Sequence, residues 1–131
     1  MLESSLLKLI PGRVSTFQKL ENAEPYHFDQ WGADRSGASC LYYWFYSGNR
    51  RSKWKKRVLV SEIRGALGHL VKSGALDRAA FRKVCPVSQS GGPCGFVVIG
   101  RIFEAIEVAQ YSGRDEGFVL TDGERAKALL R

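Results

Sequence analysis

The amino-acid sequence predicts one domain of the α+β class, spanning residues 1–131, in which a β-hairpin is added to a helical body. Two patterns carry this prediction. Residues 40–60 hold two strand-like segments joined by turn residues, which is typical of an antiparallel hairpin. After the hairpin, apolar residues recur with helical spacing between turn residues. A chain of 131 residues, of which 44% are hydrophobic, is long enough to bury a core of its own.

The first 38 residues predict a short N-terminal helix and then a segment without a clear period. Four apolar residues lie on one side of a helix over residues 2–10, which the following Pro-Gly pair would end: Leu2, Leu6, Leu7 and Ile10. Residues 13–38 fit a short helix or an irregular extended segment, because their apolar residues keep no single period. Only the helix is therefore predicted with defined bounds.

The clearest strand pattern lies at residues 40–47. Strand alternation places three aromatic residues on one face, Tyr42, Trp44 and Tyr46, and three apolar residues on the other, Leu41, Tyr43 and Phe45. At least one of these faces must therefore pack against the rest of the domain. Residues 47–49, Ser-Gly-Asn, have turn chemistry. The return strand, about 54–60, is apolar at the end near the core and basic toward the tip.

Helical spacing returns directly after the hairpin. Five apolar residues form one stripe of a helix: Ile63, Ala66, Leu67, Leu70 and Val71. Ser61 is the expected N-cap of this helix, and Gly74 stands where a left-handed cap would end it. Asp77 is expected to cap a second, short helix, which Pro86 would end.

The last third of the sequence predicts a third helix, a short strand and a final helix. Residues 88–93 are expected to be a loop that leads into a helix over about 94–109. A strand is expected at 118–121. Thr121 and Glu124 then have the spacing of a capping box for the last helix.

The order of the predicted elements over residues 58–131 resembles that of a winged helix-turn-helix domain. The feature that carries the resemblance is the strand that leads into "LTDGERAKALL", because the second wing strand of that family often runs into a Thr-capped helix. The resemblance implies a fold that mostly binds duplex DNA and in a minority of cases binds only proteins. It also implies that the helix at 94–109 is the recognition helix, with contacts from residues ahead of it and on its exposed face: Ser88, Gln89, Ser90 and Arg101.

Two elements depart from the pattern of a DNA-reading winged helix. Glu104 and Glu107 share the expected exposed face of the third helix with Arg101, and the expected wing turn holds Asp115 and Glu116. Carboxylates at these places complement DNA poorly. Either other surfaces contact the phosphates, or the winged-helix-like part is a scaffold.

The distribution of charge is the most informative feature of the sequence. The net charge of +7 is concentrated in residues 50–83, where eleven Lys and Arg stand against two acidic residues, while the remainder has a net charge of −2. A cluster of this kind is typical of a polyanionic partner, because each neutralised phosphate releases counterions. A solvated surface that only maintains solubility is the alternative interpretation. We predict a nucleic-acid-binding protein, with duplex DNA favoured over RNA and phosphates as the main contacts.

The predicted contact residues lie chiefly on the basic hairpin, with others on the second helix and around the third. They are Arg50, Arg51, Lys53, Trp54, Lys55, Lys56, Arg57, Arg78, Arg82, Lys83, Ser88, Gln89, Ser90 and Arg101. Trp54 has two interpretations: it could stack on an unpaired base, or it could pack against Tyr46 across the hairpin.

Other function classes find little support in the sequence. No nucleophile motif, paired catalytic residues or phosphate-binding loop is present, so we predict no enzyme and no cofactor. Three cysteines without metal-ligand spacing predict reduced, buried thiols and no metal site. Without a signal peptide or membrane-spanning run, the expected location is the cytoplasm. The alternative function is a protein-interaction or self-association module that uses the aromatic strand or the acidic third helix.

Overall fold

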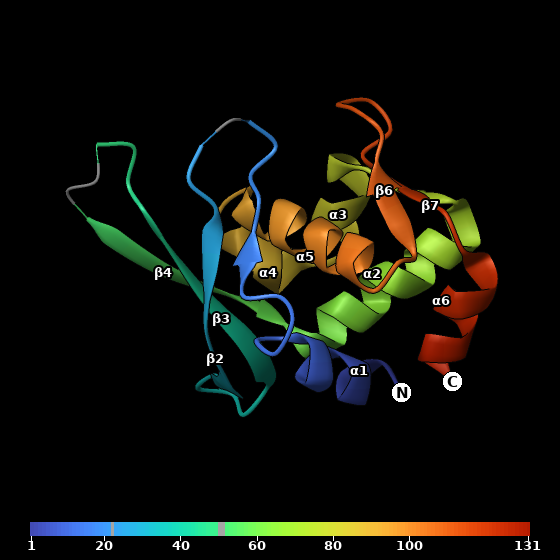
Figure 1. Ribbon diagram of the computed structural model, residues 1–131, viewed down its shortest axis with the longest axis horizontal. Helices are drawn as coiled ribbons and strands as arrows, with labels where there is room; N and C mark the ends of the chain where they lie inside the picture. Colours follow the sequence, from blue (N-terminus) through green and yellow to red (C-terminus); the bar gives the residue numbers. More distant parts are fainter. Residues whose placement is uncertain (22, 50–51) are drawn as a thin grey trace.

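The computed structural model describes residues 1–21, 23–49 and 52–131, and it is an α+β structure (Figure 1). Its helices are α1 (Leu2–Leu9), α2 (Val60–Ser73), α3 (Arg78–Val84), α4 (Pro86–Ser90), α5 (Cys94–Ala105) and α6 (Gly123–Leu130). Its strands are β1 (Thr16–Phe17), β2 (Tyr26–Ala33), β3 (Ser39–Tyr46), β4 (Lys53–Leu59), β5 (Ala75–Leu76), β6 (Ala109–Tyr111) and β7 (Phe118–Leu120). In the described residues, these strands form a four-stranded antiparallel sheet, β1-β2-β3-β4, and a three-stranded antiparallel sheet, β5-β7-β6.

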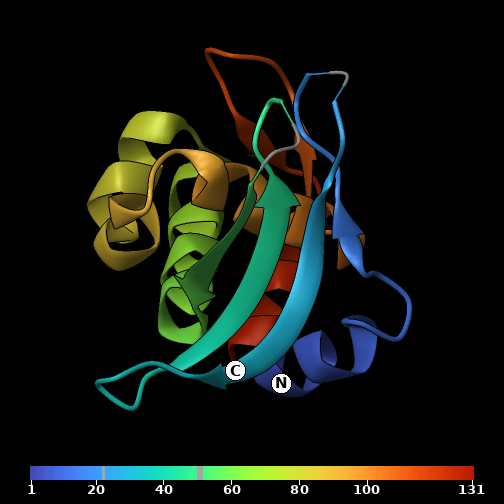
Figure 2. The same ribbon diagram turned by 90° about the vertical axis from the view of Figure 1, so that its left-hand side faces the viewer.

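Helix α5 lies between the two sheets and forms the centre of the molecule (Figure 1). Its buried residues come from every side of the helix: Gly95, Phe96, Val97, Val98, Ile99, Gly100, Ile102 and Phe103. The four-stranded sheet packs its inner face on this helical layer, whereas no helix in the described part of the chain covers its outer face (Figure 2). The sheet therefore has one core face and one face open to solvent.

The predicted hairpin is confirmed as strands β3 and β4, which pair in antiparallel register from Cys40 with Leu59 to Tyr46 with Lys53. Its long neighbour β2 is a strand that the sequence pattern did not predict. A bulge between Phe28 and Gln30 interrupts the pairing of β2 with β3. The bulge breaks the two-residue alternation that identifies a strand in a sequence.

The predicted N-terminal helix is confirmed as α1, which is one residue shorter than expected. Leu2 and Leu6 are buried, and Ile10 follows the helix as a buried, extended residue. Arg64 of α2 fixes α1 in place: its Nη2 donates to Oε1 of Glu3 at 2.6 Å, and its Nη1 donates to the Leu130 carbonyl oxygen at 3.0 Å. This hydrogen bond from Arg64 holds the pKa of Glu3 below its usual range.

Two of the predicted helix caps are confirmed and two are wrong. Gly74 ends α2 with a φ of 83°, and the Asp77 carboxylate accepts the Ala80 N–H at 2.8 Å. Ser61 is not a cap, because α2 begins one residue earlier, directly from the end of β4. Thr121 is not a cap either, because the neighbouring Asp122 accepts the Arg125 N–H at 3.0 Å and starts α6.

Two predicted boundaries around the third helix are also wrong. Residues 86–90 form the short helix α4 where the sequence predicted a helix stop and a loop. The buried carboxylate of Glu62 makes this possible, because it accepts the N–H groups of Val87 at 3.0 Å and Ser88 at 2.7 Å. Helix α5 ends at Ala105, well before position 109, because Glu107 adopts a left-handed conformation with a φ of 65°.

The two sheets are joined through a close contact between α5 and β7. A Cβ at Gly100 would lie 2.0 Å from a ring carbon of Phe118, so that only glycine lets the helix approach the strand. Phe118 also packs edge to face on Phe96, with ring centroids 5.3 Å apart. These contacts fix the helical layer on which the hairpin is mounted.

Candidate nucleic-acid interface

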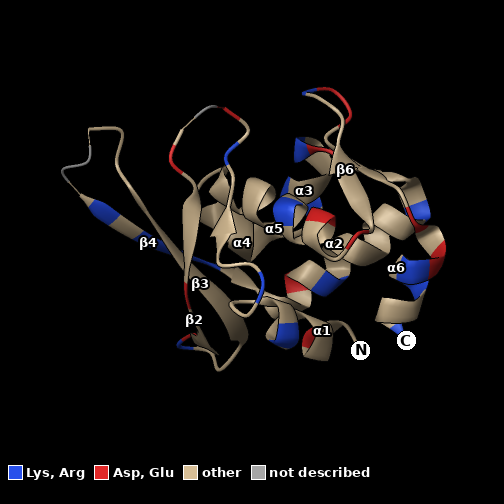
Figure 3. Cartoon of the chain, in the orientation of Figure 1, with Lys and Arg blue, Asp and Glu red and all other residues tan. Residues whose placement is uncertain are grey.

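Strand alternation divides the basic segment of β4 between the two faces of the sheet. Val58 is buried against the core, so its side of the strand is the inner face. The residues at the alternate positions, Lys53, Lys55 and Arg57, therefore point to the outer face. Trp54 and Lys56 therefore lie on the inner side. Figure 3 shows the blue basic positions running along β4, which extends past the helical layer. The predicted contacts Arg50 and Arg51 lie outside the described residues.

The outer face combines cations with aromatic rings. The Lys53 ammonium lies 4.1 Å from the centroid of the Trp44 ring, and the Lys55 ammonium lies 5.3 Å from that of Tyr42. His27 of β2 stacks on Trp44, with ring centroids 4.2 Å apart and an angle of 16° between the ring planes. The His27 and Trp44 rings thus lie face to face, and the Trp44 and Tyr42 rings lie close to the ammonium groups of Lys53 and Lys55.

Two of the outer cations have carboxylate partners. The Lys55 ammonium lies 2.8 Å from a carboxylate oxygen of Asp29, and the Nε atom of Arg57 lies 3.5 Å from one of Asp34. Hydrogen bonds from the Ser36 hydroxyl and the Ala38 backbone hold the pKa of Asp34 below its usual range, so its negative charge persists beside Arg57.

Among the described residues, Lys53 forms no ion pair, and both Lys53 and Lys55 are exposed. An exposed pair such as Lys55 with Asp29 contributes little stability, so the lysine can exchange its partner for a phosphate.

The inner side of the hairpin carries an exposed tryptophan. Trp54 is 53% exposed, because this part of the hairpin extends past the helical layer. The prediction that it packs against Tyr46 is wrong: Trp54 pairs with Phe45, whereas Tyr46 pairs with Lys53 and points to the opposite face. Lys56, on the same side as Trp54, donates to the carbonyl oxygen of Gly91.

The predicted residues of α3 lie on a different element from the hairpin. The guanidinium of Arg78 lies 4.6 Å from the centroid of the Phe96 ring, and its Nη1 donates to the Pro93 carbonyl oxygen at 3.4 Å. Arg82 and Lys83 are exposed near the end of α3. Of these three cations, only Arg78 faces the segment that Lys56 also reaches, between α4 and α5.

The predicted residues around the third helix mainly serve the fold. Ser88 is buried, and its hydroxyl accepts the Leu59 N–H at 3.0 Å. The Ser90 hydroxyl is exposed but donates to the Val87 carbonyl oxygen at 2.7 Å, while Gln89 is half-buried. The hydroxyl of Ser88 is therefore engaged inside the fold and is not exposed to a partner.

Arg101 and its acidic neighbour are also engaged inside the molecule. Nε of Arg101 donates to the Gln18 carbonyl oxygen at 2.8 Å, and Nη1 donates to the Glu104 carboxylate at 2.6 Å. The second oxygen of Glu104 accepts the Tyr111 N–H at 2.8 Å. Arg101 and Glu104 of α5 thus hold the residue after β1 and the end of β6 in place, and most of the other residues of α5 are buried.

One cation near the inner side was missing from the prediction. The Lys19 ammonium lies 5.1 Å from the centroid of the Tyr26 ring and 5.4 Å from that of Phe45. Lys19 lies two residues after the two-residue strand β1, in a segment whose sequence has no clear period. Only the pairing of β1 with β2 brings it near the hairpin, and a pairing of two residues leaves no signal in the sequence.

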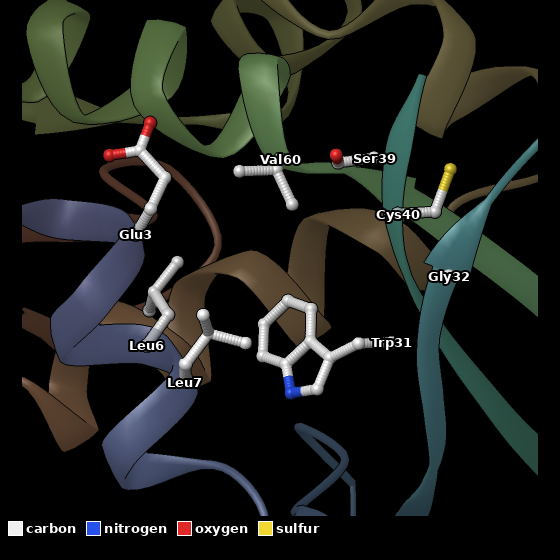
Figure 4. Close-up of a pocket in the computed structure, with 8 residues that line it drawn as sticks. All are labelled: Glu3, Leu6, Leu7, Trp31, Gly32, Ser39, Cys40 and Val60. Carbon is white, nitrogen blue, oxygen red and sulfur yellow. The ribbon is translucent and has the colours of Figure 1, made fainter. Parts of the chain in front are cut away.

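A separate apolar pocket of about 330 Å³ lies between α1 and strands β2 and β3 (Figure 4). Leu6 and Leu7 line one wall and Trp31 the other, and Leu7 is 58% exposed. The Trp31 indole nitrogen donates to the Ile10 carbonyl oxygen at 2.9 Å, which fixes the ring at the side of the pocket. The described residues that line this pocket include no Lys or Arg, and they are distinct from the basic surface.

In the described ranges, no three His, Cys, Asp or Glu side chains form a group that could hold a metal ion. Within the same ranges, every helix is too short or too polar to cross a membrane. Comparison with known proteins gives no relative from which a role could be inferred: no protein-family model, no curated protein and no solved structure matches this chain.

Proposed function

We propose that this protein binds nucleic acid, duplex DNA included, mainly through phosphate contacts on the outer face of the β3–β4 hairpin. The observation that carries the proposal is the row formed by Lys53, Lys55 and Arg57 on a sheet face that no described helix covers. Alternate residues of a strand stand about 6.6 Å apart, so the three cations form a line along one edge of the sheet. In this proposal the protein acts in the cytoplasm, where binding would serve regulation or the targeting of a partner to DNA.

The mechanism is electrostatic and independent of base sequence. Each lysine or arginine that neutralises a phosphate releases condensed counterions, and this release drives binding at low salt. The aromatic rings beside the cations, Trp44 for Lys53 and Tyr42 for Lys55, limit the freedom of the lysine side chains. A cation that is ordered in advance loses less entropy when it binds.

In this proposal, the part of the chain that resembles a winged helix, residues 58–131, is the scaffold that carries the hairpin. The order α2, β5, α3, α5, β6, β7, in which the short helix α4 is inserted between α3 and α5, and the sheet β5-β7-β6 support this resemblance. Because most of α5 is buried and its residues Arg101 and Glu104 are engaged within the fold, the proposed contacts come from the hairpin and not from the helix that such domains use to read bases.

Fluorescence anisotropy with a short random duplex across a salt series tests this proposal. Replacing Lys53, Lys55 and Arg57 with glutamine should lower the slope of log K against log salt by up to about 2.7, which is about 0.9 for each lost contact. The control is a variant with the same change of charge at three exposed lysines on other elements, Lys8, Lys72 and Lys127. This control should keep most of the slope.

Two results would overturn the proposal. One is the absence of binding to DNA and RNA at about 50 mM salt, a low concentration at which phosphate contacts dominate the affinity. The other is an equal loss of slope in the hairpin variant and the control, which would mean that net charge alone drives the interaction.

The apolar pocket beside α1 favours a second candidate function, a protein-interaction or self-association module. Leu7 is exposed at its rim, and a pocket of about 330 Å³ would accept an apolar side chain of a partner or of a second copy. A molar mass that rises with concentration in light scattering, and that Leu7→Lys returns to that of a monomer, would support self-association.

A further inference from the structure

Three cationic side chains from distant parts of the sequence converge on the inner side of the hairpin. The ammonium groups of Lys19 and Lys56 both lie near the Phe45 ring, at 5.4 and 5.6 Å from its centroid. Arg78 shares a pocket of about 240 Å³ with Lys19, and the start of α5 lines the same pocket through Pro93 and Val97. The segment between α4 and α5 connects the group, because Lys56 and Arg78 donate to carbonyl oxygens two residues apart.

These three cations are less neutralised than Lys55 and Arg57 on the outer face. In the part of the chain that the structure describes, none of the three forms an ion pair, whereas Lys55 and Arg57 on the outer face do. Among the described residues that line the pocket, Glu21 is the one carboxylate. The N-terminal end of α5, a helix of 12 residues, adds to the positive potential. A bound anion would relieve the repulsion among these groups.

An exposed aromatic residue lies on the same face of β4 as one of these cations and pairs with Phe45, near which two of them lie. Trp54 lies two residues before Lys56 on the same face of β4 and leaves 53% of its surface exposed. It forms no ring contact with the other described residues, so it contributes little to the core. An exposed indole next to cations is the combination with which proteins hold an unpaired base and its phosphate.

We propose that the inner side of the hairpin binds an unpaired nucleotide of a nucleic-acid strand. Lys19, Lys56 and Arg78 hold its phosphate, and Trp54 stacks on its base. This inference rests on the proposed function and adds a substrate form: a single strand, or a duplex with an unpaired end, binds more tightly than a blunt duplex. A fully paired duplex gains nothing from Trp54, because its bases are already stacked on one another.

Anisotropy with two labelled probes, a 12-nucleotide single strand and a blunt 12-base-pair duplex of the same sequence, tests the inference. The single strand should bind the unchanged protein more tightly. Trp54→Ala should weaken single-strand binding about tenfold, as expected for one lost base–aromatic stack, and change duplex binding less than about twofold. Trp54→Phe should retain most of the affinity, because phenylalanine keeps the stacking surface.

The charged residues give a second, independent readout. Lys19→Gln combined with Arg78→Gln should weaken single-strand binding by about tenfold, whereas Glu21→Gln should strengthen it, because it removes the carboxylate from the pocket. The gain expected for Glu21→Gln separates a binding role from a loss of folding, and thermal unfolding of each variant checks the fold directly.

The outcomes distinguish this inference from the proposed function. If both probes bind and depend on Lys53, Lys55 and Arg57 but not on Trp54, Lys19, Arg78 or Glu21, the unpaired-nucleotide site is wrong and the phosphate-binding function stands. If neither probe binds, both are wrong. Equal binding of the single strand and the duplex would also overturn the inference.

Discussion

Helix α5 and the β3–β4 hairpin use their polar residues in opposite ways. In α5, Arg101 and Glu104 make contacts that hold the residue after β1 and the end of β6, and most of the other residues of the helix are buried. In the hairpin, Lys53 and Lys55 remain exposed, and Trp54 extends past the helical layer. A resemblance in element order favours α5 as the binding element, whereas burial favours the hairpin. Burial is the stronger guide, because a buried side chain cannot reach a partner without unfolding its surroundings.

We expect the largest difference between the two regions in the free energy of unfolding when one glycine of each is replaced with alanine. Gly100→Ala places a methyl group 2.0 Å from the Phe118 ring, and such overpacking in the centre should lower the free energy of unfolding by about 3 kcal/mol or more. Gly48→Ala in the hairpin turn meets no atom of the described residues within 4 Å and should change it by less than about 1 kcal/mol. Denaturant unfolding of both variants measures the difference. Similar losses for both would mean that the hairpin is packed as tightly as the centre.

A smaller effect is expected where the hairpin joins the helical layer. Glu62→Gln removes the charged acceptor of the Val87 and Ser88 N–H groups, and it should destabilise the protein by about 2 kcal/mol. Glu116→Gln makes the same change of charge on an exposed turn and should have almost no effect on denaturant unfolding. An unchanged midpoint for Glu62→Gln would show that α4 does not need its carboxylate cap.

Arg101→Gln and Lys55→Gln should give opposite results in two assays. Arg101→Gln should cost about 1 kcal/mol of stability, because it breaks two hydrogen bonds, and should leave duplex affinity within about twofold. Lys55→Gln breaks only an exposed ion pair, so it should change stability by less than about 0.5 kcal/mol while weakening binding. If Arg101→Gln weakens binding more than Lys55→Gln does, the comparison between helix and hairpin is wrong.

The smallest expected difference concerns the thiols. Burial raises the pKa of Cys85 to about 12, and burial also raises the pKa of Cys40, so both thiols stay protonated at pH 8. Only the thiolate reacts with disulfide reagents, and Cys94 at the start of α5 is the one partly exposed cysteine. A thiol reagent at pH 8 should therefore label Cys94 first and the other two only after denaturation. Fast labelling of all three would contradict the burial of Cys40 and Cys85.

The sequence predicted elements that have strong local signals and missed those that depend on distant partners. The hairpin, α1, Gly74 and Asp77 each follow from residues close together in the chain. Helix α4 does not, because its N-terminal N–H groups depend on Glu62, more than twenty residues earlier. The same limit applies to the candidate interface, where charge located the basic strand but only the paired sheet shows that Lys19 joins Lys56.

Because β4 presents different residues on its two faces, its function and packing are sensitive to insertions and deletions that change the alternation. Val58, Lys56 and Trp54 occupy one set of alternate positions, and Lys53, Lys55 and Arg57 occupy the other. Deleting a single residue from the strand would exchange the sets and turn cations toward the buried Tyr43. Adding two residues near the turn would keep the alternation and lengthen both sets of positions together. Insertions or deletions of two residues in this hairpin should therefore be tolerated, whereas those of one residue should disrupt the packing of the strand.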